Sequence, residues 1–473
     1  MRRLTTLALG LCALAALAAE YRAGPEDYRA YLNRLQAGDR LLLAAGDYTR
    51  GLPLHGLEGT AEAPIVIEGP AEGPRARFLA RRGANTVSLT NVRHIVIRNL
   101  ELDGQNLPVD AVKAEGHARY AHYVTLENLH IHDHNASQQN VGISTKAPAH
   151  GWVVRGNRIE RVGTGMYFGN SDGFAPFVAG LIEHNTVRDT LGYNLQIKHQ
   201  RPRPEGMPGA GQRHDTVIRR NLFDKSAGGS TGPMARPNVL VGHWPLSGEG
   251  TEDRYLIYAN LFWQNPTEAL FQGEGNVALY NNLFVNHHGS AVRIQPHNNV
   301  PRRVEIFYNT VLARDEGIAV RLREGQPEWP RVVLHNLILA GRPLLGAEAR
   351  GNLTGALAEA GRWLIRPTHA IEGLDLAPRS VHPCEVAAHT ASAAEYPEGL
   401  RDHDGRPRAG CSLGACVGSP CPTSRETRTS WPTGVGKIYI NTLDKSAQTC
   451  SLNKKNFPIW PGSCLHISYT VDG

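Results

Sequence analysis

The sequence predicts an all-β solenoid, in which short strands stack in successive coils along a rod. A short apolar strand followed by an asparagine recurs about every 30 residues through the middle of the chain, which is the period of a structural repeat. The repeating unit shows strands and no helical pattern, so it cannot bury its apolar side alone and must stack on copies of itself. The asparagines are Asn99, Asn128, Asn157, Asn185, Asn221, Asn260, Asn282, Asn309 and Asn336. Asparagine tolerates a left-handed corner, and its amide can bond to the equivalent amide one coil away.

Composition supports one long domain with an extension at each end. Aromatic residues make up 7% of the chain and glycine contributes 50 of 473 residues, which suits thin coils with many tight corners. Residues 1–19 combine two arginines, an apolar run and the small-residue site around Ala18. This pattern is typical of a secretory signal peptide and is too short to span a bilayer. We therefore expect a secreted or periplasmic protein without stable membrane insertion.

The two ends of the predicted rod have distinct signals. Residues 25–35 place Tyr28, Tyr31, Leu32 and Leu35 on one helical face, which predicts a short N-terminal capping helix. Strands around RLLLA, PIVIEG and TVSLT then precede Asn99, and residues 402–416 form a closing segment. We expect the rod to occupy residues 20–416 and a Cys, Ser and Thr-rich tail of unknown role to follow at 417–473.

The cysteines mark the same boundary. Apart from Cys12, all of them lie in the last 90 residues, and an even number in an oxidising compartment favours disulfides over a zinc site. The sequence does not determine their pairing. They are Cys384, Cys411, Cys416, Cys421, Cys450 and Cys464.

The segment LQAGDRLLLAAGDYT, the following GTAEAPIVIEG and the asparagine-cornered coils together resemble exported proteins of the pectate-lyase-like superfamily. The resemblance is nearest to the branch of alginate lyases and chondroitinase B and covers residues 25 to 416. It implies a single-stranded right-handed parallel β-helix whose substrate groove lies over one stack of strands. It does not imply one activity, because lyases, hydrolases, epimerases and non-catalytic adhesins share such rods.

A second strand precedes each asparagine strand, and its alternation predicts a cationic groove. If Ile143, Phe168, Ile197, Val241, Ile294 and Leu322 point inward, the alternate residues point outward and lie side by side. The outward set is Ser144, Lys146, Tyr167, Gln196, Lys198, Arg293, Gln295, Arg321 and Arg323. A groove with these cations suits an anionic, uronate-containing polysaccharide, and we expect no nucleic acid partner and a monomeric protein.

Elimination from a uronate needs a group that neutralises the carboxylate, a base for the C5 proton and an acid for the departing O4. We predict Lys198 as the base, because neighbouring cations disfavour its ammonium form. Arg293 or Lys146 would hold the carboxylate, and Tyr167 or His199 would donate the final proton. Gln196, Arg321 and Arg323 would contact substrate. The competing interpretation of each residue is a solvated charge on an exposed face.

Long Gly and Pro-rich insertions add further candidates beside the groove. His243, Trp244, Glu249 and Glu252 would border it, with Trp244 either stacking on sugar or packing under its loop. No cofactor is required, but Glu268, Glu274 and Asn238 form an acidic and amide set that could hold Ca²⁺. His130, His132 and His134 share one face of a strand, a spacing that suits either a transition metal or ordinary surface histidines.

Three alternatives to a lyase stay open. A non-catalytic glycan-binding or scaffold rod would show the same cationic groove without needing a base. The NSDG at 170–173 with QIK at 196–198 is similar to motifs of polygalacturonase-type hydrolases, although the further aspartates and the Gly-His-Gly of that family are missing. A uronate epimerase is the third alternative.

Overall fold

The computed structural model describes residues 18–346, 348–368, 370–380, 395–408 and 413–422. The chain divides into two units between Arg425 and Glu426, and the described residues all belong to the first. The predicted signal peptide and the predicted tail lie mostly outside the described residues. Five cysteines also lie outside them: Cys12, Cys384, Cys411, Cys450 and Cys464. No helix among the described residues is long and apolar enough to cross a membrane.

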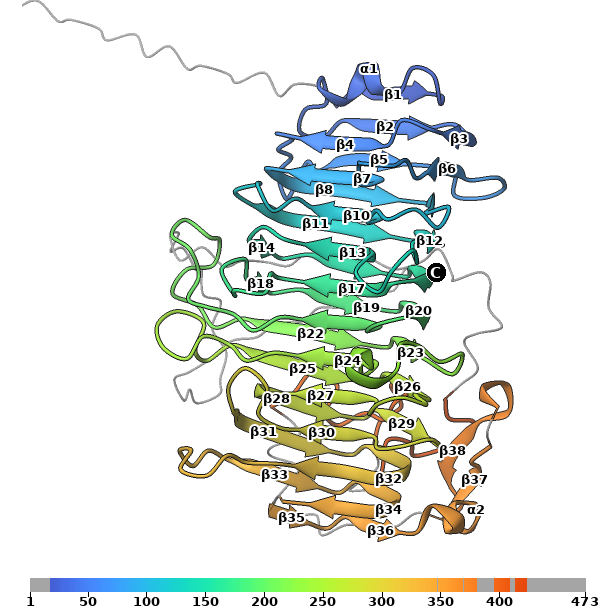
Figure 1. The fold of residues 1–473 in the computed structure, drawn as a ribbon, viewed down its shortest axis with the longest axis vertical. Coiled ribbons are helices and arrows are strands. Elements are labelled where there is room, and N and C mark those ends of the chain that lie inside the picture. Colours follow the sequence, from blue (N-terminus) through green and yellow to red (C-terminus); the bar gives the residue numbers. More distant parts are fainter. Residues whose placement is uncertain (1–17, 347, 369, 381–394, 409–412, 423–473) are drawn as a thin grey trace, which may run out of the picture. The chain divides into compact units, whose positions relative to one another are not determined.

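The first unit is a parallel β-helix with three stacks of strands, and Figure 1 shows its coils following one another from blue to orange. Every pairing within the stacks is parallel, because each strand bonds to its counterpart one coil earlier and one coil later. The fold predicted from the asparagine repeat is therefore confirmed.

The first stack carries the apolar strands that precede the asparagines. Its strands are β1 (Glu20–Ala23), β2 (Arg40–Leu43), β5 (Ile65–Glu68), β8 (Val92–Arg98), β11 (Ala121–Glu127), β15 (Val153–Arg155), β19 (Leu181–Glu183), β22 (Asp215–Arg219), β25 (Arg254–Tyr258), β28 (Gly275–Tyr280), β31 (Pro301–Phe307), β33 (Arg331–Leu334) and β35 (Glu348–Arg350), with β14 (Ala149–His150) and β18 (Phe177–Val178) paired beside them.

The second stack follows the asparagine corner. Its strands are β3 (Gly46–Tyr48), β6 (Ala76–Leu79), β9 (Leu100–Asp103), β12 (His130–His132), β16 (Arg158–Val162), β20 (Thr186–Thr190), β23 (Leu222–Asp224), β26 (Leu261–Trp263), β29 (Leu283–Asn286), β32 (Thr310–Val320), β34 (Leu337–Leu345) and β36 (Leu353–Gly355).

The third stack completes each coil. Its strands are β4 (Leu52–His55), β7 (Val87–Thr90), β10 (Val112–Ala114), β13 (Val141–Thr145), β17 (Thr164–Phe168), β21 (Leu195–Ile197), β24 (Val239–Val241), β27 (Phe271–Gly273) and β30 (Val292–Ile294). The long strands β32 and β34 run through both the second and the third stack, which joins the two stacks into one sheet.

The ladder of asparagines runs along one corner, as predicted, and it has two forms. Asn99 and Asn128 are themselves left-handed, with φ of 60° and 51°. From Asn157 onward the left-handed residue is the one before the asparagine, for example Gly156 or Ala259. The backbones of these later asparagines do not adopt the left-handed corner conformation. Their side-chain amides are buried and bond to the next asparagine at 2.9 to 3.0 Å, as in Asn157 to Asn185 and Asn260 to Asn282. The ladder continues to Asn352, which the sequence pattern did not include.

Both ends of the coil are covered. At the N-terminal end, Tyr28 and Leu32 are buried, and Tyr28 packs edge-on against Tyr48 and Phe78. The predicted capping helix over 25–35 is only a short helix, α1 (Arg29–Leu32). At the other end lie η2 (Leu357–Glu359), α2 (Ala360–Trp363), β37 (Leu364–Arg366), η3 (Ile371–Gly373) and the antiparallel partner of β37, β38 (Asp375–Pro378).

The closing segment extends past the predicted boundary at 416. Cys416 and Cys421 form a disulfide, and both are buried in an apolar cluster with Leu312 and Leu376. The backbone amide of Cys421 donates to Asp375 at 3.0 Å. Residues 417–422 therefore belong to the β-helix unit and not to the tail.

Candidate functional site

The outer face of the third stack carries the row of polar residues on which the candidate site is built. Strand pairing places Lys113, Ser144, Tyr167, Gln196, Leu240, Gln272 and Arg293 in register. The intervening residues Ile143, Phe168, Ile197, Val241 and Ile294 are fully buried, as the alternation predicted. A second row begins just beyond the strand ends with Lys146 and Lys198.

A groove of about 880 Å³ lies over this face. Its floor includes Lys146, Tyr167, Gln196 and Lys198, all four of which the sequence singled out. Its side is formed by residues 232–237 of the long insertion after β23, which contains the short helix η1 (Gly232–Met234). The lining also includes residues that the sequence reading did not select: Asp110, Lys113, Gln139, Tyr193, Arg236, Gln272 and His297.

Lys146 is held against the floor of the groove. Its ammonium nitrogen donates to the Gly169 carbonyl at 3.3 Å and lies 3.4 Å from the centre of the Tyr167 ring. Burial, followed by the charge of Lys113, lowers the pKa of Lys146 to about 8. Lys146 is therefore still mostly protonated at pH 7 but loses its proton more readily than an ordinary lysine.

Lys198 lies two coils further along the same row. Gly169 is between the two lysines, with φ of 85°, and a Cβ there would come within 3.3 Å of the Lys198 Cβ. Glycine thus gives the lysines a clear path across the intervening coil. Burial is the main cause that lowers the pKa of Lys198; the Glu274 carboxylate opposes this shift, and the Arg236 guanidinium adds to it. Among the described residues the Lys198 ammonium has no hydrogen bond or ion pair.

Tyr167 supplies a phenol hydroxyl to the groove. Its oxygen lies 3.3 Å from the hydroxyl of Ser171, in the turn after β17. Burial raises the pKa of Tyr167, which keeps the phenol protonated and able to donate. Asp172 in the same turn accepts from the amide of Phe174 at 2.8 Å, so the NSDG segment caps its own turn.

Arg293 does not line the groove, contrary to the prediction that it holds a substrate carboxylate. Its guanidinium pairs with Glu268 at 2.6 Å and Glu316 at 3.2 Å. Arg321 also pairs with Glu316. Arg342 pairs with Glu316 as well, so two acids are shared among three arginines. Because Arg293 and Arg321 are both engaged in these pairs, neither is assigned as the main partner of a substrate carboxylate.

The strand register at the coil that contains β32 also differs from the prediction. Val320 and not Leu322 occupies the inward position after Ile294, and Leu322 is 48% exposed. Arg321 is consequently aligned with Gln295 rather than with Arg293, and Arg323 lies beyond the strand on the surface. The prediction was displaced by two residues at this coil.

The insertion at 243–252 lines a separate cavity of about 390 Å³, and not the main groove. His199 and His243 stack there with ring centres 5.2 Å apart. His199 therefore lies outside the lining of the groove where it was predicted to be an acid. Trp244 is fully buried and stacks on Tyr255 at 4.4 Å, so it packs under the loop and offers no plane for a sugar.

Acidic residues of the insertion at 243–253 form ion pairs with Arg203 of the insertion at 201–215. Arg203 is buried, pairs with Asp253 and lies 3.2 Å from Glu249. This arrangement joins the insertions at 201–215 and 243–253, so Glu249 has a structural contact in place of the predicted groove position. Glu252 is not among the lining residues of the groove or of the smaller cavity.

The residues predicted to hold calcium have other partners. Glu274 accepts four backbone amides, from His243 and residues 297–299. Glu268 pairs with Arg293, and the amide oxygen of Asn238 accepts from Asn265 at 3.0 Å. These contacts leave no shared site for Ca²⁺ between the three side chains.

Comparisons with known proteins were made on sequence and on structure. No protein-family model matches the chain, and no curated protein sequence matches it. Among solved structures, a PL6 family alginate lyase, AlyGC, is 13% identical with a TM-score of 0.49, over 76% of this chain and 55% of that protein. The chain thus spans about half the length of AlyGC.

Two further structures are similar to this chain. A mannuronic acid specific polysaccharide family 6 lyase from human gut microbiota is 14% identical with a TM-score of 0.44, over 70% of this chain and 82% of that one. The catalytic unit of a GH87 alpha-1,3-glucanase from Streptomyces thermodiastaticus is 12% identical with a TM-score of 0.41, over 72% of this chain and 68% of that one. At these values the similarities carry no argument about activity, and the β-helix assignment rests on the strand pairing.

Proposed function

We propose that this protein is a polysaccharide lyase, which binds an anionic, uronate-containing polysaccharide along the third stack and cleaves it by β-elimination. The observation that carries the proposal is the placement of two lysines with lowered pKa, Lys146 and Lys198, on either side of the half-buried Tyr167 within one groove. Isolated surface lysines keep their charge, so this pairing favours a chemical role over a solvated face.

Binding follows from the charge and shape of the groove. Coils repeat at about 4.8 Å, so cations on successive coils form a row that can follow the carboxylates of an extended acidic chain. Lys113, Lys146, Lys198 and Arg236 contribute positive charge to the lining, while Lys113 is partly offset by Asp110 at 3.2 Å. Arg236 and Lys146 take the role of carboxylate binding that the sequence assigned to Arg293 or Lys146.

The reaction needs three groups in the groove. A positive charge from Lys146 or Arg236 would stabilise the negative charge that develops on the sugar carboxylate as the C5 proton leaves. Neutral Lys198 would accept that proton, because its ammonium has no competing partner and its pKa is lowered toward working pH. The Tyr167 hydroxyl would protonate O4 as the bond from C4 to O4 breaks and the double bond between C4 and C5 forms.

A substrate panel tests the proposal. The protein is incubated with alginate, pectate, chondroitin and heparin, and the ultraviolet absorbance of the unsaturated uronate is followed over time. Absorbance should rise with at least one of these polymers. If none yields product while one of them binds, the protein is a glycan-binding rod and the lyase assignment is wrong.

A further inference from the structure

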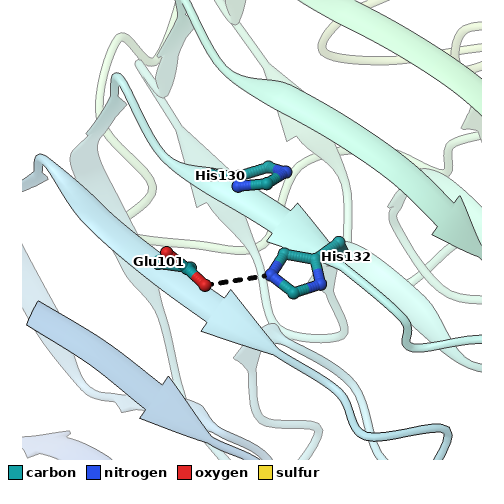
Figure 2. Close-up of side chains that lie close together, drawn as sticks. All are labelled: Glu101, His130 and His132. Carbon is teal, nitrogen blue, oxygen red and sulfur yellow. Dashed lines mark hydrogen bonds and ion pairs between the residues drawn. The ribbon is translucent and has the colours of Figure 1, made fainter. Parts of the chain in front are cut away.

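A cluster of histidines and carboxylates lies on the outer face of the second stack, away from the groove. Figure 2 shows its centre: Glu101 on β9 with His130 and His132 on the next strand, β12. Strand pairing aligns His130 with Glu101 and His132 with Asp103, while Leu102 and Ile131 between them point into the core. The proposed reaction uses none of these side chains.

His134 does not belong to the cluster, although the sequence spacing suggested it. The chain turns at Asp133, which has φ of 59°, and this turn carries His134 to the inside. His134 is fully buried and its Nδ1 lies 3.0 Å from the Val109 carbonyl. The candidate ligands are therefore two histidines of β12 and one carboxylate of β9, and not the three histidines that the sequence suggested.

Each histidine of the cluster is oriented by a carboxylate of its own. His132 Nδ1 lies 2.7 Å from Asp133, and His130 Nε2 lies 3.0 Å from Glu160 on β16. A carboxylate only accepts, so protons on His132 Nδ1 and His130 Nε2 satisfy these two contacts and leave His132 Nε2 and His130 Nδ1 for a ligand. A carboxylate that accepts from one ring nitrogen while the other is a ligand is the usual outer support of a histidine metal site.

The second ring nitrogen of His132 also faces a carboxylate. Its Nε2 lies 3.3 Å from Glu101 Oε1, so both ring nitrogens of His132 lie beside carboxylate oxygens. Arginines pair with the two outer carboxylates, Arg161 with Asp133 and Arg158 with Glu160. Among the described residues Glu101 has no ion pair with Arg or Lys. Either a second proton on His132 or a metal ion can bridge Nε2 and Glu101, and the nearby His130 is a ligand that a metal ion would use and a proton would not.

The spacing of the three side chains suits a small tetrahedral metal. Ligand atoms of Glu101, His130 and His132 all lie within 4.8 Å of one another. Ligands bound to zinc at about 2.0–2.1 Å in a tetrahedron are roughly 3.4 Å apart, close to the separation of His132 and Glu101. Two nitrogens and one oxygen are a zinc-type ligand set and leave a fourth position for water.

We propose that Glu101, His130 and His132 bind one zinc-like divalent transition metal ion, with Asp133 and Glu160 orienting the two histidines. The ion would join the coils that contain β9 and β12 at their outer surface. Since it binds the folded coils and not the unfolded chain, it would also stabilise the rod.

The test measures binding of zinc chloride to protein treated with a chelator and then dialysed, using titration calorimetry, with calcium chloride as a comparison. Cobalt chloride provides a second readout through its visible absorption, which reports on nitrogen and oxygen ligands. We expect one zinc per chain, no comparable binding of calcium, and a higher melting temperature with zinc.

Variants locate the ion. Glu101→Gln and His130→Gln should weaken zinc binding by about tenfold or more and alter the cobalt spectrum, and Asp133→Asn should weaken it by about 10- to 100-fold by releasing His132. His117→Gln removes an exposed histidine elsewhere and should change nothing. Melting temperatures without metal establish that each variant is folded.

Asp103→Asn separates the proposed set from its neighbour, because Asp103, His132 and Asp133 also lie within 4.8 Å of one another. Zinc affinity should survive this change. Loss of binding in Asp103→Asn with full binding in Glu101→Gln would overturn the ligand assignment. Absence of zinc binding by the folded parent would overturn the site itself and would mean that a proton on His132 occupies the gap. Neither result depends on activity toward polysaccharides.

Discussion

The ammonium group of Lys146 rests on the face of Tyr167, 3.4 Å from the ring centre. The contact joins two successive coils of the third stack and positions both side chains on the floor of one groove. An ammonium over a ring face is attracted by the ring quadrupole. Lys146 is therefore held in place by its neighbours, whereas Lys198, two coils on, has no such partner among the described residues.

This difference predicts separate effects for the two lysines. Lys198→Ala should abolish turnover on the cleaved polyuronate while changing substrate affinity by only several-fold, because a base acts in the transition state and one cation among several adds little to binding. The measurement compares kcat with affinity from calorimetry. Arg323→Ala, which removes an exposed cation beyond the groove, is the matched control and should retain turnover. Normal kcat in Lys198→Ala would exclude it as the base.

The hydroxyl of Tyr167 can be removed without disturbing the ring that supports Lys146. Tyr167→Phe should lower kcat by about 100-fold, the typical contribution of a general acid, and leave affinity nearly unchanged. The kcat of Tyr167→Phe should return toward the parent value when the natural leaving group is replaced by one that departs without a proton. If Tyr167→Phe loses affinity and kcat equally on both substrates, the residue positions substrate and does not donate the proton.

The pH dependence of kcat should report the lowered pKa of the base. Lys198 must be neutral to accept a proton, so kcat should rise with pH through a midpoint below 10.5, the ordinary pKa of lysine. Arg236 is one of the charges that lowers this pKa, so Arg236→Gln should move the midpoint upward, whatever its effect on binding. A midpoint that falls or stays fixed in Arg236→Gln would contradict the assignment of Lys198.

The two forms of the asparagine ladder predict different costs of substitution. Asn260→Gly removes a buried amide that donates to Asn282 and to two carbonyls, so it should lower the free energy of unfolding by about 2 kcal/mol or more. Asn99→Gly keeps the left-handed corner and loses mainly the bond from Asn128, so about 1 kcal/mol is expected. Chemical denaturation measures both. Equal losses would mean that the ladder contributes through backbone geometry alone.

The repeat made the fold predictable because one asparagine in each coil must occupy the same corner. Alternation then placed Ile143 and Ile197 inside and Lys146 and Lys198 outside, since strand geometry has a period of two. The same rule was wrong at Leu322, because β32 continues through two stacks and its register against β30 depends on pairing that a local pattern does not contain.

Contacts between distant residues explain the other differences. Arg293 was expected in the groove, but Glu268 and Glu316 reach it from neighbouring coils, and sequence alone does not reveal such pairing. Trp244 follows a strand just as an exposed aromatic would, and only the packing on Tyr255 shows that it is buried. For the groove wall, the sequence indicated that Gly and Pro-rich insertions border the groove, but not that residues 232–237 would line it.

We propose that the groove over the third stack performs β-elimination, and the masses of the reaction products decide this claim. Elimination leaves the new non-reducing end unsaturated, so each such fragment is lighter by one water molecule than the fragment that hydrolysis would release. Mass spectrometry of the parent's products should show these lighter fragments, and the Lys198→Ala protein should produce none. Fragments that carry the full water, or lighter fragments in equal amount from the Lys198→Ala protein, would contradict the claim.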